Sequence, residues 1–264
     1  MSAGMHSYAQ TILQLYNQLQ AGGYSPVEMT LVRNAYDFAM RRFAGRFQPS
    51  GKTFIAHVVG TASILASIRA PAEVVAAGLL HNIYVNGDFP DGTSGFNKAK
   101  QRALRRIMGG AVERYVVAFL ALRWSSQDIA AINDGSVKLG PFEREVVLIK
   151  LADELEHLLD LDVLYYNPAI SKLFVESAGI CVEAAKKLGF PALAADLANT
   201  LRLIASSDSP PGLCCHRDRN FAFVIVPKSY RRIFFRPFCR RRIRQLRSLS
   251  SGIMRRLSAL SRHN

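Results

Sequence analysis

The chain has few cysteines and no long apolar run. Its 264 residues include four cysteines at irregular spacing, which are too few for a disulfide framework. The apolar run Phe221–Val226 is about a third of the roughly 18 residues that a membrane-spanning helix needs, and no run in the chain comes near that length. The segment Met1–Tyr8 lacks the charged stretch and apolar run that are typical of a secretory leader. These absences predict a cytoplasmic protein without a transmembrane segment.

Several signatures of enzymes and metal sites are also missing. The chain has no Gly-rich phosphate loop, no Gly-x-Ser-x-Gly elbow and no Cys/His nucleophile signature, which argues against the P-loop and serine-hydrolase classes. Cys214, Cys215 and His216 are directly adjacent, whereas structural zinc pairs leave about two to four residues between ligands. A zinc site at this cluster is therefore disfavoured.

Positive charge is concentrated at the C-terminal end. The net charge is +14, but residues 217–264, called the tail below, hold fourteen Lys or Arg and one acid. Residues 1–216 hold twenty basic and nineteen acidic residues, so charge arguments about partners concern only the tail. Its arginines lie between apolar residues at helical spacing, which favours a partly helical segment on an anionic membrane surface. Nucleic acid is a less favoured partner, and an accidental extension is the third interpretation.

The remainder of the chain is predicted to be all-α. Apolar residues from Tyr8 to about Ser206 recur every three or four positions rather than every second one, which indicates helices. Prolines near the starts of helices and glycines near their ends mark the boundaries. We expect helices near residues 7–20, 26–44, 54–69, 71–83, 97–107, 110–123, 142–165, 169–188 and 192–206. The predicted organisation is a helical domain over residues 1–206, a linker over 207–216 and the basic tail over 217–264.

Three mostly apolar segments contain the polar residues that could carry chemistry. They read Phe54-Ile-Ala-His-Val-Val-Gly-Thr-Ala62, Ala76-Ala-Gly-Leu-Leu-His-Asn82 and Ile149-Lys-Leu-Ala-Asp-Glu-Leu-Glu-His157. Each histidine alone fits either a core residue with a satisfied ring or a metal ligand. Asp153 lies roughly opposite the leucine stripe of its predicted helix. Either it is exposed and pairs with Lys150, or its helix is buried on two faces and the acid needs a partner such as a metal.

Together the three segments resemble the HD-domain superfamily, and most of all the hydrolase domain of RelA/SpoT-type stringent-response proteins. The resemblance covers roughly residues 40–165. It implies an HD-type helical bundle in which His57, His81, Asn82 and Asp153 fall on the four ligand positions of a divalent metal, manganese or iron. Imidazoles and carboxylates suit such ions and leave positions open for water and a phosphoryl oxygen. The resemblance also implies hydrolysis of a nucleotide or another small phosphorylated compound.

Two departures from the family's pattern predict an impaired site. Asn82 stands where the family has aspartate, and this loss of charge should weaken metal binding by at least the roughly 10- to 100-fold that loss of a second-shell partner causes. The acidic Glu-Asp motif that follows in the stringent-response hydrolases is also absent. Asp88 and Asp91 are the only nearby acids. They are candidate catalytic residues, or turn formers in a loop over residues 86–95 that is rich in Gly, Asn and Asp.

Three cations and a second function complete the predictions. Arg46, Lys52 and Lys150 lie in or beside the matching segments and are candidate phosphate-binding residues or ordinary surface cations. The alternative to a phosphohydrolase is a catalytically inactive HD-like domain that binds a ligand or regulates a partner. The segment Ala-Gly-Leu-Leu-His-Asn resembles the corresponding segment in a branch of HD-like proteins in which the aspartate is missing. Both functions stay open on the sequence.

Overall fold

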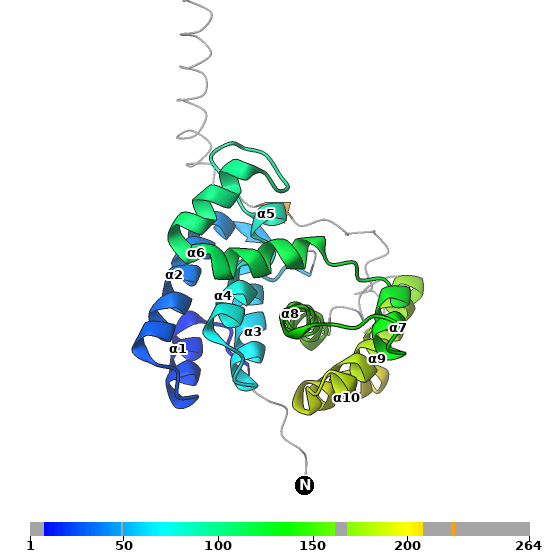
Figure 1. The fold of residues 1–264 in the computed structure, drawn as a ribbon. Helices are drawn as coiled ribbons and strands as arrows, with labels where there is room; N and C mark the ends of the chain where they lie inside the picture. Colours follow the sequence, from blue (N-terminus) through cyan, green and yellow to red (C-terminus); the bar gives the residue numbers. More distant parts are fainter. Residues whose placement is uncertain (1–7, 49, 162–167, 208–222, 225–264) are drawn as a thin grey trace, which may run out of the picture. The chain divides into compact units, whose positions relative to one another are not determined.

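The structure is a computed structural model, and it describes residues 8–48, 50–161, 168–207 and 223–224. The chain divides into two compact units, Met1–Phe223 and Val224–Asn264, and every described helix belongs to the first. The helices are α1 (Ile12–Ala21), α2 (Pro26–Phe43), α3 (Phe54–Ser67), α4 (Ala72–Leu80), α5 (Ile83–Asn86), α6 (Lys98–Ala121), α7 (Ser126–Asn133), α8 (Pro141–Leu159), α9 (Pro168–Lys187) and α10 (Pro191–Ala205) (Figure 1). Strand in the described residues is limited to the short β1 (Arg46–Phe47) and β2 (Phe223–Val224). The all-α prediction is confirmed.

Side-chain hydrogen bonds determine where several helices begin. Thr11 and Gln14 form a capping box at the start of α1, and Ser25 and Glu28 form one at the start of α2. In a capping box each side chain accepts a hydrogen bond from the backbone N–H of the other residue. The apolar pattern predicts that the first helix begins near residue 7. The cap at Thr11 explains why α1 begins at Ile12 instead.

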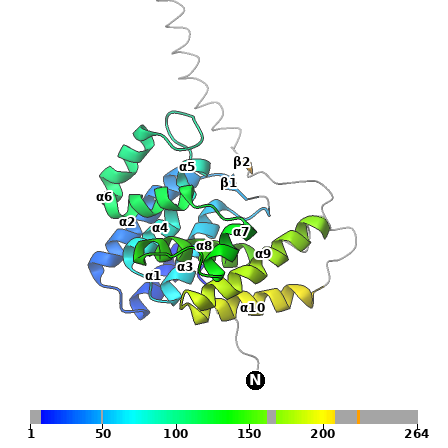
Figure 2. The same ribbon diagram turned by 45° about the vertical axis from the view of Figure 1, so that its right-hand side comes forward.

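The helices between residues 83 and 133 differ in detail from the prediction. The short helices α5 and α7 fall where the sequence predicts no separate helix, and α7 begins with a capping box of Ser125 and Asp128. The predicted break between residues 107 and 110 is present as a bend within α6 (Figures 1 and 2). Gly109 has φ 80° and ψ 174° there, a conformation open mainly to glycine.

Helix α8 carries Asp153 and is surrounded by other helices. It contacts α3, α4, α6, α9 and α10. Figure 1 shows it end-on, between α3 and α4 on one side and α7, α9 and α10 on the other. Most residues of α8 are buried, including Asp153 and Glu156. Of the two alternatives for Asp153, the structure therefore shows burial of its helix on two faces.

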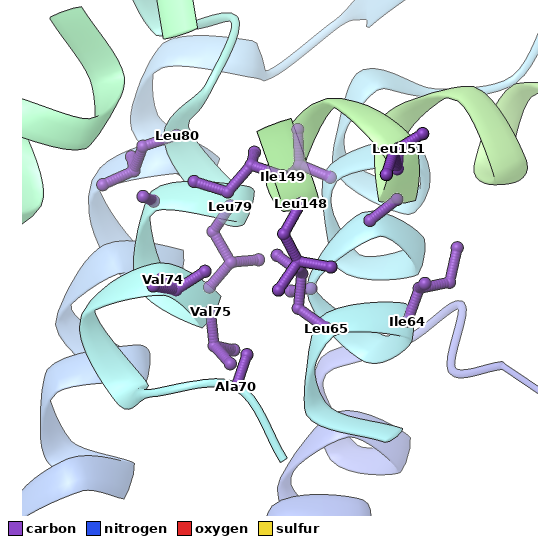
Figure 3. Close-up of a cluster of buried hydrophobic side chains, with 14 of the residues drawn as sticks. Ile64, Leu65, Ala70, Val74, Val75, Leu79, Leu80, Leu148, Ile149 and Leu151 are labelled. Atoms are coloured by element: carbon purple, nitrogen blue, oxygen red, sulfur yellow. The ribbon is translucent and has the colours of Figure 1, made fainter. Parts of the chain in front are cut away.

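A cluster of aliphatic side chains holds α3, α4 and α8 together (Figure 3). Its members include the buried residues Ile64, Leu65, Val74, Val75, Leu79, Leu80, Leu148, Ile149 and Leu151. Burial of apolar surface stabilises a fold by roughly 25 cal/mol per Å². Close packing in this cluster fixes the relative positions of the three helices that carry the polar residues of interest.

The predicted linker and tail lie almost entirely outside the described residues. Helix α10 ends at Ala205, beside the predicted end of the helical domain, and residues 208–222 and 225–264 are not described. The helical tail and its membrane or nucleic-acid partner therefore stay predictions. In the part of the chain that the structure describes, no helix combines the length and the apolar character needed to cross a bilayer.

Replacement of Leu65 by alanine is expected to lower the free energy of unfolding by about 2 to 5 kcal/mol, because it opens a cavity in the aliphatic cluster. Leu65 is fully buried, whereas Leu13 on α1 is 70% exposed. The matched variant Leu13→Ala is expected to change the free energy by less than about 0.5 kcal/mol. Urea unfolding of both variants measures the difference, and equal losses would contradict this packing.

Candidate metal centre

The four predicted ligands come together where α3, α4 and α8 meet. Helix α3 supplies His57, the turn between α4 and α5 supplies His81 and Asn82, and α8 supplies Asp153. The Nε2 atoms of the two histidines are 3.3 Å apart, and each lies 3.2 Å from Asp153 Oδ1. The side-chain nitrogen of Asn82 is 2.8 Å from His81 Nε2. Two imidazole nitrogens and one carboxylate oxygen thus form a triangle of candidate ligand atoms.

Hydrogen bonds on the far side of each ring turn both Nε2 atoms toward Asp153. His57 Nδ1 donates to the carboxylate of Glu156 on α8, and His81 Nδ1 donates to the Gly78 carbonyl at 2.7 Å. Metal-ligating histidines commonly donate their other ring N–H to a carboxylate or a backbone carbonyl, which fixes the tautomer. Both rings therefore have the outer contacts that are typical of metal ligands.

The spacing of the three candidate ligand atoms fits a divalent cation. Bonds from zinc-like ions to imidazole nitrogen and carboxylate oxygen are roughly 2.0 to 2.2 Å long, so adjacent ligand atoms in tetrahedral or octahedral geometry lie about 3 to 3.5 Å apart. The observed separations of 3.2 and 3.3 Å fall in that range. A cation among His57, His81 and Asp153 would therefore require little rearrangement.

One buried oxygen of Asp153 lacks a hydrogen bond. Asp153 is 3% exposed, and its Oδ1 forms no hydrogen bond of acceptable geometry with any described residue, although two ring nitrogens lie 3.2 Å away. Lys150 Nζ contacts the other oxygen, Oδ2, at 2.8 Å. A buried carboxylate oxygen without a hydrogen bond is costly. A bound cation would contact this oxygen more closely than the ring nitrogens do, so the residues present fit a metal.

The charges in the centre keep its acids ionised. Burial raises the pKa of Asp153, but Lys150 and the neighbouring histidines lower it well below the usual value. Burial also raises the pKa of Glu156, and His57 and Lys52 outweigh this effect and lower it. Burial lowers the pKa of His57, whereas Glu156 and Asp153 raise it to about 9. The two acids therefore favour the protonated form of His57, and a divalent cation would compete with that proton.

Asn82 lies beside the triangle with a neutral side chain. It is half-buried, and its amide N–H donates to His81 Nε2. Rotation of the amide by 180° would exchange its nitrogen and oxygen, which are assigned from such contacts. An uncharged amide oxygen is a weaker ligand for a hard cation than the carboxylate of aspartate. Asn82 therefore lies beside the centre, and its role as a weak metal ligand stays a prediction.

Lys52 is paired with Glu156, the acid that contacts His57. Its ammonium contacts Glu156 and lies 3.0 Å from Asp160 Oδ1, and Glu156 in turn accepts the hydrogen bond of His57. Gly60 on α3 leaves room for this acid, since a Cβ at that position would lie 2.6 Å from Glu156 Oε1. Lys52 thus reaches the centre through Glu156, and its predicted phosphate-binding role stays a prediction.

Lys150 lies closer to the triangle than the other two predicted cations. Its Nζ is 2.8 Å from Asp153 Oδ2 and 2.9 Å from Glu154 Oε1. These are the i+3 and i+4 pairs that the sequence offered as the alternative to a functional role, although Asp153 is buried rather than exposed. Arg46 lies in β1 and is half-buried. Phosphate binding by Lys150 and Arg46 stays a prediction.

The acids predicted to be catalytic lie in the loop after α5. Asp88 and Asp91 are exposed. Asp91 accepts hydrogen bonds from Asn97 Nδ2 at 2.8 Å and from the Thr93 backbone at 3.1 Å, and these bonds lower its pKa. Among the residues that the structure describes, neither acid belongs to a group that could hold a metal. The contacts of Asp91 support the turn-forming alternative, and a catalytic role for either acid stays a prediction.

Three further residues belong to the centre although the sequence did not single them out. Glu156 and His157 follow Asp153 at i+3 and i+4, the spacing that places side chains on one helix face. This spacing is the signal that would have indicated them once Asp153 was known to be buried. Phe119 of α6 packs edge-on against the His81 ring, with centroids 4.9 Å apart. Because Phe119 is far from His81 and Asp153 in the sequence, no helical spacing relates it to them, and no sequence pattern indicates that it belongs to the centre.

Comparison with known proteins identifies the family of this chain. The family model described as HD domain matches residues 35–190, which is more than half of the chain and includes all four predicted ligands. The chain belongs to the HD-domain family. A solved structure described as a metazoan ortholog of SpoT that hydrolyzes ppGpp and plays a role in starvation responses matches with a TM-score of 0.47 and 20% identity, over 68% of this chain and 96% of that chain.

Curated relatives of this HD domain are named as plant GTP diphosphokinases. The rice protein (Oryza sativa subsp. japonica) named probable GTP diphosphokinase RSH2, chloroplastic, is 30% identical over 171 residues, which are 60% of this chain and 22% of the relative. The chloroplastic RSH1 protein of rice is 27% identical over 179 residues, which are 65% of this chain and 20% of the relative. The Arabidopsis thaliana RSH1 protein is 24% identical over 188 residues, 69% and 21% of the two chains. The chain spans about a fifth of the length of these relatives.

Replacement of Glu156 by glutamine in this HD domain is expected to weaken Mn²⁺ binding by roughly 10- to 100-fold, because the amide lacks the charge that orients and polarises His57. Asp160→Asn is the matched control, since both acids contact Lys52 but Glu156 is the one that contacts His57. Titration calorimetry of metal-depleted protein should find the control close to wild type. Equal losses in the two variants would show that Glu156 does not act through His57.

Replacement of Asn82 by aspartate is expected to strengthen Mn²⁺ binding by at least about 10-fold, because it adds a charged oxygen beside the HD domain's triangle. Asn82→Ala is the matched control, because it removes the amide without adding charge, and it should show no gain. The same titration measures both variants. If Asn82→Asp binds Mn²⁺ no more tightly than wild type, residue 82 does not contact the metal.

Proposed function

We propose that this HD domain is a metal-dependent phosphohydrolase that acts on a nucleotide or another small phosphorylated compound. The observation that carries the proposal is the buried triangle of His57 Nε2, His81 Nε2 and Asp153 Oδ1, in which the oxygen has no hydrogen bond to a described residue. Manganese or iron is the proposed metal, because imidazole and carboxylate together suit first-row divalent ions. When bound, such an ion acidifies water and polarises a phosphoryl oxygen.

The residues beside the triangle would bind and orient the phosphate. Burial lowers the pKa of Lys150, but Asp153 and Glu154 outweigh this effect and raise it, so the ammonium stays charged. The Lys150 side chain is 20% exposed and can therefore contact both Asp153 and an incoming anion. The ring centroid of Phe119 lies 5.7 Å from Lys150 Nζ, and the residue is half-buried. It would form an apolar wall that limits access of bulk water on that side.

Guanine nucleotides are the first substrates to test. The plant relatives are named GTP diphosphokinases, and this chain matches about a fifth of their length. We infer the same class of nucleotide as ligand for this domain. Its phosphate groups would meet Lys150, while His57, His81 and Asp153 would hold the metal and Glu156 would keep His57 oriented.

A phosphate-release assay on the manganese-loaded full chain tests the proposal. We expect hydrolysis of at least one of ppGpp, GTP and GDP, with loss of activity on chelation and in Asp153→Asn, which removes the charged oxygen from the triangle. Asn82→Asp should be at least as active as wild type, because its metal binding is tighter. Absence of product from metal-loaded wild type and metal-loaded Asn82→Asp would overturn the enzymatic proposal.

A catalytically inactive binding domain is the second candidate function. It is favoured by the neutral amide of Asn82 and by Lys150, whose ammonium lies 2.8 Å from Asp153 Oδ2 and already supplies positive charge beside the carboxylate. Such a domain would bind a phosphorylated ligand or regulate a partner without turnover. Nucleotide binding to metal-free protein in equilibrium dialysis, with no hydrolysis by either wild type or Asn82→Asp, would favour this function over the enzyme.

A further inference from the structure

We propose that His157 is an additional ligand of the metal centre, so that three imidazoles and one carboxylate bind the ion. The proposal rests on the metal centre described above and extends it by one residue. His157 lies outside the four positions that the family resemblance assigns. It would serve as a ligand in place of the aspartate carboxylate that the family has at position 82, where Asn82 offers only a neutral amide.

The position of His157 follows from the helical spacing of α8. It lies four residues after Asp153, on the same helix face. Its Nε2 is 3.5 Å from Asp153 Oδ1, and the Nε2 atoms of His57 and His81 lie 3.2 Å from the same oxygen. Three imidazole nitrogens thus surround one buried oxygen that has no hydrogen bond to a described residue. A cation near this oxygen would lie within reach of all three rings.

Contacts with the other ligands place the His157 ring against the centre. Its ring centroid is 4.7 Å from that of His57, with an angle of 35° between the planes. His57, Glu156 and His157 form a second group of candidate ligand atoms within 4.8 Å of one another, which shares His57 with the triangle. The His157 side chain is 40% exposed, whereas His57 and His81 are buried. His157 therefore lies at the solvent side of the centre, where it can turn onto a metal without disturbing the core.

The chemistry of the candidate ligands explains what His157 would add. Asn82 offers a neutral amide oxygen, which is a weaker donor to a divalent ion than a carboxylate. A neutral imidazole is a strong donor for first-row metals from iron to zinc, whereas carboxylate and carbonyl oxygens suit manganese and magnesium. Replacement of a carboxylate by His157 would therefore hold the ion while shifting the preference from manganese toward iron, cobalt or zinc.

Cobalt titration of the metal-depleted full chain tests this assignment, because the visible absorption of Co²⁺ reports its ligands directly. His157→Ala and His157→Gln are each expected to weaken Co²⁺ binding by at least roughly 10-fold, because loss of an outer-shell partner alone weakens metal binding by about 10- to 100-fold. The absorption bands of the bound ion should change as well. Affinity for Mn²⁺ should fall less than affinity for Co²⁺, because manganese gains less from an imidazole.

Two further variants separate ligation from a structural role. Asn82→Ala is expected to lose less Co²⁺ affinity than His157→Ala, although both residues border the same centre. The double variant Asn82→Asp/His157→Ala should recover Mn²⁺ affinity to the wild-type level or above, with a lower preference for Co²⁺ over Mn²⁺. Thermal unfolding of the metal-free variants checks that each one folds.

The outcomes distinguish failure of this proposal from failure of the metal centre itself. Tight Co²⁺ binding by wild type, with unchanged affinity and absorption in both His157 variants, would overturn the role of His157 and leave the centre intact. A wild-type protein that binds neither Co²⁺ nor Mn²⁺ would overturn both. Weaker binding in the His157 variants with rescue of Mn²⁺ affinity in the double variant would support the three-imidazole centre.

Discussion

The burial of polar and charged groups between α3, α4 and α8 is the constraint on which the rest of the structure depends. His57, His81, Asp153 and Glu156 are each at most 3% exposed, and the helices that carry them are otherwise largely apolar. Charge in such surroundings is costly unless it is paired and hydrogen-bonded. The aliphatic cluster in Figure 3 holds the three helices close enough for this pairing.

The pairing follows one continuous path of alternating charge. It runs from Lys52 through Glu156 to His57, and from there to Asp153 and Lys150. Every contact along this path is made from a helix or the residues beside one, so the polar groups are held by rigid elements rather than by loops. The Oδ1 atom of Asp153 is where the path lacks a hydrogen bond. A divalent cation at this atom would take the place of the His57 proton in the alternation, as the proposed metal centre requires.

Most of the fold, and the meeting of His57, His81 and Asp153 at the centre, could be predicted from the sequence. Apolar periodicity and cap residues such as Ser25 predicted the long helices, and the break predicted between residues 107 and 110 is the bend in α6 at Gly109. The meeting of His57, His81 and Asp153 followed from the family resemblance, because no local rule states which distant helices pack together. Glu156 was missed because a glutamate in a helix is usually exposed. Its burial depends on contacts far away in the sequence.

The account's central claim is that a divalent ion binds at the triangle of His57 Nε2, His81 Nε2 and Asp153 Oδ1. The most direct measurement is a crystal structure of the protein grown with Mn²⁺, with data collected for anomalous scattering. We predict one strong anomalous peak bonded to all three atoms at about 2.0 to 2.3 Å, with Lys150 still paired to Glu154. A map without an anomalous peak at the triangle, or with the ion bound elsewhere, would contradict the claim.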